Sequence, residues 1–175
     1  TSALPLARKI AEHAYKAGAG LVSTIFSDEE MTLARYRYGH DLSFDRAPGW
    51  LYDGVARAFD ENTARLAISG DNPMLLGTQD PEKVGRANRA NSKAYRPALS
   101  KIVGHDINWS IVPYPGASWA RVVFPDDEED VAVNKLAEAL FAATRVSTSD
   151  PVAEWDAHNR RLRERRDWLT GKNFS

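Results

Sequence analysis

Hydrophobic residues spaced for helices alternate along this chain with short apolar runs that are typical of buried strands. The strand candidates are residues 21–26, 64–69 and 109–112. Residues 21–26 are mostly β-branched or aromatic, and glycine and acidic residues bound them. Because strands and helices take turns along the sequence, the pattern predicts an α/β domain with a mostly parallel sheet.

Helix signals fill the regions between these strands. Capping or turn residues mark the expected helix starts at Ser2, Ser27, Asp80, Asp126 or Asp127, and Asp150. Leu51, Val55, Ala58 and Phe59 form the stripe of a further short helix. Gly18 and Gly171 are expected to end the first and last helices. Pro97 is expected to kink or divide the long helix that starts at Asp80.

Apolar stripes indicate which side of each later helix faces the core. In the long helix the stripe is Val84, Ala87, Asn91, Ala94, Tyr95, Ala98, Leu99 and Ile102. In the next helix it is Val133, Leu136, Ala137, Leu140 and Phe141, and in the last it is Val152, Trp155, Leu162 and Leu169. Spacings of three and four residues are those of an amphipathic helix.

The predicted fold class is a layered α/β/α domain with a small, mostly parallel sheet. We expect residues 1–175 to form one amino-terminal α/β domain. Three strands make a poor sheet, and the first helix has no strand before it. The pattern therefore indicates a segment trimmed at both ends from a larger, two-domain protein.

The composition excludes several classes of function. With 23 Lys and Arg against 24 Asp and Glu, the chain lacks the basic surplus of a nucleic-acid-binding protein. There are no cysteines, which excludes thiol nucleophiles and thiolate metal sites and fits a cytoplasmic location. No apolar run approaches the length of about 18 residues that a membrane span needs, so we expect neither a nucleic-acid partner nor a membrane partner.

Two Gly-His-Asp triplets, residues 39–41 and 104–106, are the first candidates for metal chemistry. Neutral imidazole and carboxylate can converge on one ion. Each triplet also follows a predicted helix, where glycine and a polar exit are ordinary. We expect the structural role for both, and no metal ligand in this segment.

Three further motifs are weaker. Residues 18–20 (Gly-Ala-Gly) lie between a helix and a strand, the reverse of the order that a dinucleotide site needs. Residues 116–118 (Gly-Ala-Ser) lack the second glycine of a nucleophile elbow, and two prolines argue against a tight strand-to-helix turn there. The run of five arginines in residues 160–168 also contains Glu164 and Asp167, so a solvated or interface helix face is favoured over a nucleic-acid patch.

Five segments resemble the amino-terminal domain of the aminopeptidase T and AmpS family of thermophilic-type metallo-aminopeptidases. They are PLARKIAEHAYKAGA from Pro5, LVSTIFSDEEMTLARYRYG from Leu21, ISGDNPMLL from Ile68, NWSIVPYPGASWARVVFP from Asn108, and DPVAEWDAHNRRLRERRDWLTGKNF from Asp150. They occur in the expected order and span most of the chain.

The resemblance implies a dimeric, cytoplasmic peptidase that removes amino-terminal residues from peptides with two divalent metal ions, commonly zinc or cobalt. The family's metal ligands belong to the carboxy-terminal domain, so the resemblance implies no catalytic residue and no bound ion in this segment. The last helix, 150–170, would lead toward that missing catalytic domain.

The stretch from Val112 to Phe124 leaves the carboxyl end of a predicted strand, where ligands and partner domains dock on open α/β sheets. We expect Tyr114, Trp119, Arg121 and Phe124 to line the substrate cavity or an interface. Covering the sheet edge is the competing role for the aromatic residues. The alternative function is a free-standing α/β ligand-binding or interaction domain, and a sugar- or nucleotide-binding module is disfavoured because no phosphate loop is present.

Overall fold

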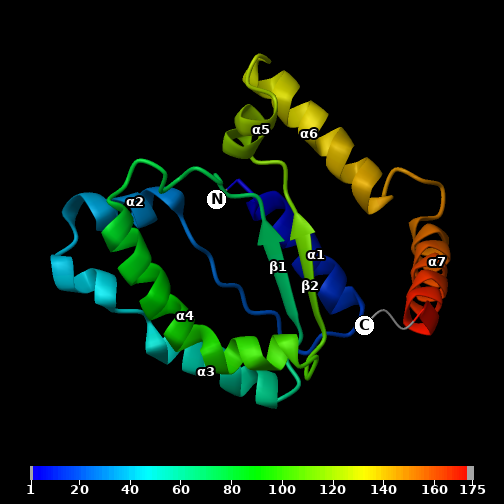
Figure 1. Ribbon diagram of the computed structural model, residues 1–175, viewed down its shortest axis with the longest axis horizontal. Helices are drawn as coiled ribbons and strands as arrows, with labels where there is room; N and C mark the ends of the chain where they lie inside the picture. The colour runs from blue at the N-terminus through cyan, green and yellow to red at the C-terminus, as the bar shows by residue number, and fades with distance from the viewer. Residues whose placement is uncertain (1, 173–175) are drawn as a thin grey trace. The chain divides into compact units, whose positions relative to one another are not determined.

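The computed structural model describes residues 2–172. In chain order its elements are α1 (Leu4–Lys16), α2 (Glu29–Tyr38), the 3-10 helix η1 (Asp41–Asp45), α3 (Gly49–Asp60), β1 (Arg65–Ser69), α4 (Pro81–Val103), β2 (Trp109–Pro113), α5 (Ala117–Val123), α6 (Glu129–Thr144) and α7 (Pro151–Lys172) (Figure 1). The mixed α/β class is confirmed, with helices far outweighing strands. The backbone divides into two compact units, one ending at Trp119 and one beginning at Ala120.

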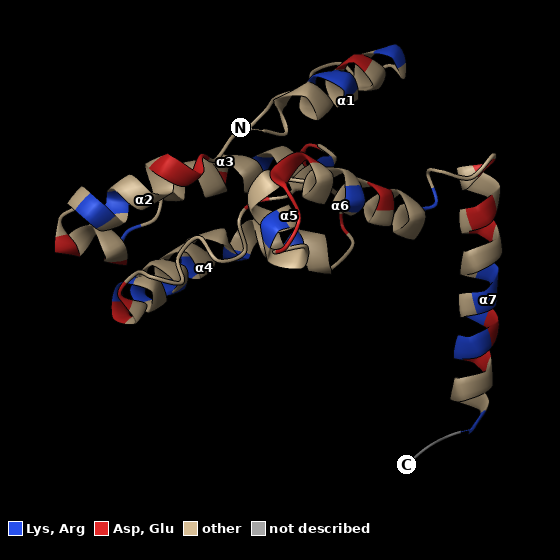
Figure 2. Cartoon of the chain, turned by 90° about the horizontal axis from the view of Figure 1, so that it is seen from above, with Lys and Arg blue, Asp and Glu red and all other residues tan. Residues whose placement is uncertain are grey.

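The sheet of the first unit consists of β1 and β2, which pair in parallel with Arg65 opposite Trp109 and Ser69 opposite Pro113. Helix α4 connects the two strands, so together they form a β-α-β unit, as parallel strands require. Helices α1 and α4 lie on opposite sides of this sheet (Figures 1 and 2). The prediction of a small parallel sheet is therefore confirmed.

Packing of α3 against α4 forms the core of the first unit. The buried residues of this cluster are Ala56, Phe59, Ala98, Ile102 and Ile107, with Val55 and Tyr95 packed against them. Asp80 caps α4 through its Oδ1, which accepts a hydrogen bond from Glu82 N at 2.8 Å, and Pro81 occupies the first helical position, where its missing N–H costs nothing. Leu99, expected to face the core, is 43% exposed.

Pro97 does not divide the long helix, while the kink that was the other expected effect of this proline stays a prediction. Helix α4 runs as one element from Pro81 to Val103. Proline removes one backbone hydrogen bond and crowds the preceding turn. Burial of Ala98 and Ile102 against α3, immediately after the proline, holds the following turn in the helix.

The strand predicted at residues 21–26 is absent from the structure. These residues belong to no helix or strand. Leu21, Ile25 and Phe26 are 80, 65 and 53% exposed. Their side chains suit a strand, but a strand also needs a neighbour for its backbone groups, and the described residues provide none.

Three helix starts and one helix end also differ from the sequence prediction. Helix α6 has Glu128 at its N-cap and not Asp126 or Asp127, and Gly171, expected to end the last helix, lies inside α7. The cap of α2 is Asp28 and not Ser27, because Asp28 Oδ1 accepts a hydrogen bond from Met31 N at 3.0 Å. Helix α1 begins after Ala3, which offers no capping side chain. Its end is as expected, since Gly18 adopts φ +96°, which glycine tolerates best.

Helix α5 was not predicted. It begins four residues after β2 ends, so the prolines of this stretch permit a short strand-to-helix connection that the sequence argument had excluded. Pro113 is the last residue of the strand and Pro115 lies in the connection. Neither proline needs to donate a hydrogen bond within an element interior, which is why both are tolerated.

The second unit contains α6 and α7, and polar contacts connect the end of α6 to the first turns of α7. Trp155 Nε1 donates a hydrogen bond to Thr144 O at 3.0 Å, and the Arg145 guanidinium lies 4.6 Å from the centre of the Trp155 ring. Arg145 Nη2 is 3.1 Å from His158 Nδ1. Burial lowers the pKa of His158, and the neighbouring Arg145 charge lowers it further.

The apolar side of α7 was expected to face a core, but α7 has no buried residue. Val152, Trp155, Leu162 and Leu169 are 72, 40, 49 and 51% exposed. Figure 2 shows basic and acidic residues along the length of this helix. In α6, Leu136 is buried as predicted, whereas Phe141 is 51% exposed. Among residues 2–172, no helix combines the length and the hydrophobicity that crossing a membrane requires.

Candidate functional site

A crevice of about 330 Å³ lies at the carboxyl ends of the two strands. Four short segments of the first unit line it: residues 2–3 at the start of α1, 27–30 at the start of α2, 68–71 at the end of β1, and 114–118 from the end of β2 to the start of α5. Ser69 and Pro115 are not among the lining residues. In open parallel sheets this end is where ligands bind. This crevice therefore lies where an α/β protein most often places a site.

Two glycines set the shape of this crevice. Gly70, the residue after β1, and Gly116, the residue before α5, lie against each other's loops. A Cβ on Gly70 would collide with the carbonyl oxygen of Tyr114, and a Cβ on Gly116 would collide with the carbonyl oxygen of Gly70. Only glycine permits this close backbone approach between the two strand ends.

A hydrogen bond between α2 and the loop after β1 fixes another wall of the crevice. Glu29 Oε1 accepts a hydrogen bond from Asn72 N at 2.7 Å, which ties the first turn of α2 to the loop after β1. Asn72 Oδ1 in turn accepts a hydrogen bond from Met74 N at 2.9 Å and shapes that loop. The first contact joins segments 43 residues apart in the sequence and the second is local to the loop, and together they position Asp71 at the crevice.

The lining is acidic. It includes Asp28, Glu29, Glu30 and Asp71, together with the hydroxyl residues Ser2, Ser27 and Ser118. Among residues 2–172, no Lys, Arg or His lines the crevice. Such a surface favours positively charged or hydrogen-bond-donating groups and disfavours anions such as phosphate.

The four predicted site residues separate into two pairs. Tyr114 lines the crevice, and Trp119 lines a smaller neighbouring hollow of about 170 Å³ that shares Gly70 and Asp71 with it. Arg121 instead pairs with Glu129, and Phe124 has the Lys135 Nζ 5.7 Å from its ring centre. Both of these contacts lie within the second unit, and a role for any of the four in binding stays a prediction.

Sequence reasoning missed the acidic residues of the crevice. Asp28 and Asp71 were not singled out as site residues, although each lies two residues after a strand-like run in the sequence. A carboxylate just after the carboxyl end of an apolar run is a usable signal, because parallel strands bring such positions together. Ser118, dismissed as a nucleophile, does line the crevice, but no histidine lies beside it in that lining.

The residues of the two Gly-His-Asp triplets make structural contacts at the ends of helices. His40 Nδ1 accepts a hydrogen bond from Leu42 N at 3.2 Å and so caps η1. His105 adopts φ 57° just after α4 and stacks on Trp109, with ring centres 6.4 Å apart. Helix termination at Gly39 and Gly104 is confirmed.

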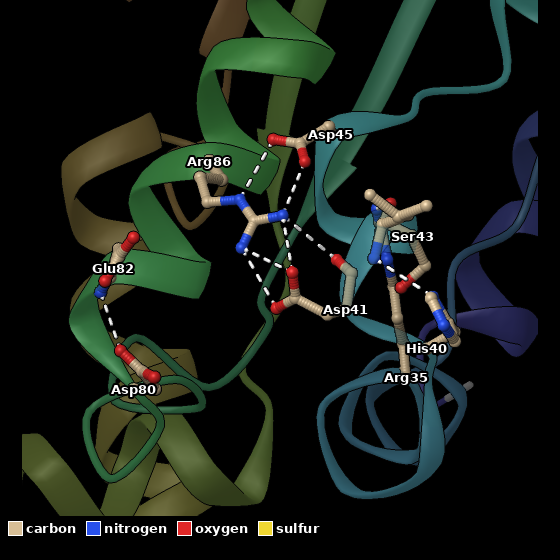
Figure 3. Close-up of polar contacts among 9 residues, drawn as sticks. Arg35, His40, Asp41, Ser43, Asp45, Asp80, Glu82 and Arg86 are labelled. Carbon is tan, nitrogen blue, oxygen red and sulfur yellow. Dashed lines mark hydrogen bonds and ion pairs between the residues drawn. The ribbon is translucent and has the colours of Figure 1, made fainter.

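Asp41 of the first triplet belongs to an ionic cluster with Arg86 (Figure 3). Arg86 Nη1 lies 3.0 Å from Asp41 Oδ1, and Arg86 Nε donates to Asp45 Oδ1 at 2.9 Å. These hydrogen bonds from Arg86 lower the pKa of both aspartates, and the two carboxylates raise the pKa of the guanidinium. The cluster attaches η1 to α4, which leaves Asp41 unsuited to a metal.

Within residues 2–172, no three His, Asp or Glu side chains come together as ligands for a metal ion do. In the acidic crevice, the carboxylates of Asp28 and Glu29 accept hydrogen bonds from backbone N–H groups. These residues therefore do not fit a metal centre.

Comparison with known proteins decides the family. The model of the family described as "Thermophilic metalloprotease (M29)" matches residues 1–175. The chain belongs to this family. The family's description implies a metal ion. Among residues 2–172, no group of His, Asp or Glu side chains is arranged to hold one.

The relatives are aminopeptidases. The chain is 47% identical over 172 residues to aminopeptidase T of Thermus thermophilus and 34% identical over 172 residues to aminopeptidase 2 of Geobacillus stearothermophilus, in each case covering 98% of this chain. The solved structure of wild-type AmpT from Thermus thermophilus is similar with a TM-score of 0.91 and 46% identity over 99% of this chain. The chain spans only 42% of the length of each of these relatives.

Proposed function

We propose that this chain is the amino-terminal domain of a metallo-aminopeptidase, which hydrolyses amino-terminal residues from peptides. The observation that carries the proposal is the match to aminopeptidase T, 47% identical over 98% of this chain but only 42% of the relative. The family's description supplies the metal dependence. We assign the metal ligands, for two divalent ions such as zinc or cobalt, to the carboxy-terminal part of the complete enzyme.

In that enzyme the domain shapes the substrate cavity and supports dimerisation. The acidic crevice supports the first role, because carboxylates at the end of a parallel sheet offer a favourable environment to the protonated amino terminus of a peptide. Trp119, beside the crevice, and the exposed apolar residues of α7 supply surface of the kind that interfaces cover. We place the complete dimer in the cytoplasm.

The test compares two proteins in the same assay. Release of chromophore from an aminoacyl-nitroanilide is measured with zinc or cobalt added, using the 175-residue chain and a version extended to the length of the relatives. We expect metal-dependent turnover only from the extended protein. Turnover by the 175 residues alone would overturn the assignment of the metal site, and silence from both would favour a free-standing binding or interaction domain.

A further inference from the structure

The attachment of α7 to α6 depends chiefly on three side chains, those of Arg145, Trp155 and His158. Trp155 Nε1 donates a hydrogen bond to Thr144 O at 3.0 Å, and Arg145 Nη2 lies 3.1 Å from His158 Nδ1. Among residues 2–172, these are the only hydrogen bonds that join α7 to the end of α6. Because α7 has no buried residue, its position on α6 is sensitive to the loss of either contact.

Arg145 adopts a backbone conformation that arginine seldom takes. It is the residue after α6, with φ 61° and ψ 12° in the left-handed region, where glycine or asparagine is the usual residue. A long side chain at such a position carries a backbone cost that a specific contact commonly offsets. Here the guanidinium lies 4.6 Å from the centre of the Trp155 ring, a cation–π contact, and also reaches His158.

The contact between Arg145 and His158 requires a neutral imidazole. A guanidinium has donors and no acceptor, so His158 Nδ1 accepts the hydrogen bond and the ring proton lies on Nε2. A second ring proton would sit on Nδ1, leaving two positively charged donors face to face. The carboxylate of the connection between the helices does not offset this charge, since Asp150 Oδ1 accepts a hydrogen bond from Ala153 N at 3.0 Å.

The surroundings of His158 disfavour that second proton. Burial and the charge of Arg145 lower the pKa of His158 below the ordinary value of 6.5, and Arg161 and Arg165 on the same helix lower it further. Glu154, four residues earlier on α7, favours the charged ring, but burial and the three guanidinium groups outweigh it. The stabilising contribution of neutral His158 is therefore complete above pH 6.5 and is lost as the pH falls through the lowered folded-state pKa.

We propose that Arg145, Trp155 and His158 form a pH-sensitive joint, which holds the start of α7 against the end of α6 while His158 is neutral and releases it when His158 is protonated. On protonation Arg145 loses its acceptor and moves away from the ring, so its contact with Trp155 is lost as well. Helix α7 itself persists, because its capping bond from Asp150 does not involve the joint. The proposal does not depend on the peptidase assignment, since it concerns only the contacts between α6 and α7.

The experiment measures the distance between the two helices as the pH changes. The chain has no cysteine, so Asn134→Cys on α6 and Thr170→Cys on α7, both at exposed positions, provide two sites for spin labels. We expect a narrow distance distribution at about pH 7.5 and a clearly broader one at about pH 5, within the range over which histidine titrates. The midpoint of this change should lie below pH 6.5 and coincide with the titration of His158 followed by NMR.

Three variants of the labelled chain isolate the role of the joint. In His158→Asn an amide oxygen replaces Nδ1 as the acceptor and cannot be protonated in this range, so the distribution should stay narrow at both pH values. Arg145→Asn tolerates the left-handed conformation but removes the guanidinium, and it should broaden the distribution at both pH values. His13→Asn, on α1 of the first unit, is the matched control and should respond to pH as the parent does.

A distribution of equal width at both pH values would overturn the proposal, and so would a pH response that His158→Asn retains. A proton on His158 Nδ1 at neutral pH, recognised from the nitrogen chemical shifts of the imidazole, would exclude the contact with Arg145. Circular dichroism of the same samples should show unchanged helix content. Loss of helix at the lower pH would mean that the domain unfolds, which contradicts the release of an intact α7.

Discussion

Single side chains join the elements of the first unit, and Arg86 is the clearest example. Its side chain is 17% exposed, while those of its partners Asp41 and Asp45 are 59 and 52% exposed. A guanidinium that bonds two carboxylates holds them in a planar geometry that lysine could not reproduce. The contact attaches η1 to α4 beside Phe44, which is fully buried.

Replacing Arg86 should destabilise the first unit in a pH-dependent way. Because hydrogen bonds from Arg86 lower the folded-state pKa of both aspartates below the ordinary value of 3.8, their stabilising contribution is complete above that value. It is lost as the pH falls through the lowered folded-state values. We expect Arg86→Gln to lower the melting temperature at neutral pH, with a difference from the wild type that shrinks below about pH 4.

Thermal unfolding followed by circular dichroism from pH 7 to pH 2.5 would test this, with Arg96→Gln on the same helix as the matched control. Added salt should reduce the difference, since both carboxylates are more than half exposed. A difference that stays constant across the pH range would contradict an ionic origin.

At the scale of the elements, the crossing of the loops after β1 and before α5 decides the shape of the crevice. Gly70 and Gly116 allow the two backbones to touch, and Glu29 holds the start of α2 against the same loop. Each of these contacts joins positions more than 40 residues apart in the sequence. The crevice is therefore a property of how the elements meet and not of any one of them.

Gly70→Ala should displace the loop at residues 114–116, because the new methyl group meets a carbonyl oxygen and not a flexible side chain. We expect a loss of about 1–3 kcal/mol in the free energy of unfolding, as for other overpacked sites. Gly54→Ala is the control: it lies inside α3 with no atom within 4 Å of the added Cβ, and it should stabilise by about 0.5–1 kcal/mol. Urea titration of both variants measures the two changes, and equal effects would refute the close approach.

At the scale of the whole molecule, the exposed apolar surface is the dominant feature. Residues 21–26, both faces of the small sheet and the whole of α7 carry large side chains that no described residue buries. A domain with so many uncovered apolar residues is consistent with one part of a larger assembly. The match to 42% of each aminopeptidase relative agrees with this view.

Trp119 provides the test at this scale. Its indole lines the hollow next to the crevice with Gly70 and Asp71. In the extended enzyme, Trp119→Ala should weaken dimerisation or alter peptide selection by about tenfold, equivalent to ~1.4 kcal/mol. Mass photometry gives the dimer dissociation constant, and kcat/KM for a panel of aminoacyl-nitroanilides gives the selectivity. Trp50→Ala, at a 77% exposed position, is the control, and no change in either quantity would remove Trp119 from both roles.

Local signals in the sequence were sufficient for the α/β class, the strands at β1 and β2, and the start of α4 at Asp80-Pro81. Capping, proline placement and apolar spacing act over a few residues, so they can be read without the fold. The same signals misplaced residues 21–26, whose strand propensity is real but whose partner is absent from the described residues. They also assigned α7 a buried side that it does not have.

Only the tertiary structure decided where the crevice lies and which residues line it. The crevice brings together residues 2–3, 27–30, 68–71 and 114–118, and no spacing in the sequence links these four segments. Sheet pairing and helix packing fix such contacts across long stretches of chain, and neither propensity nor periodicity carries that information. The sequence thus determined most of the elements and the family, while the parallel pairing of β1 with β2 and the approach of Gly70 to Gly116 determined the site.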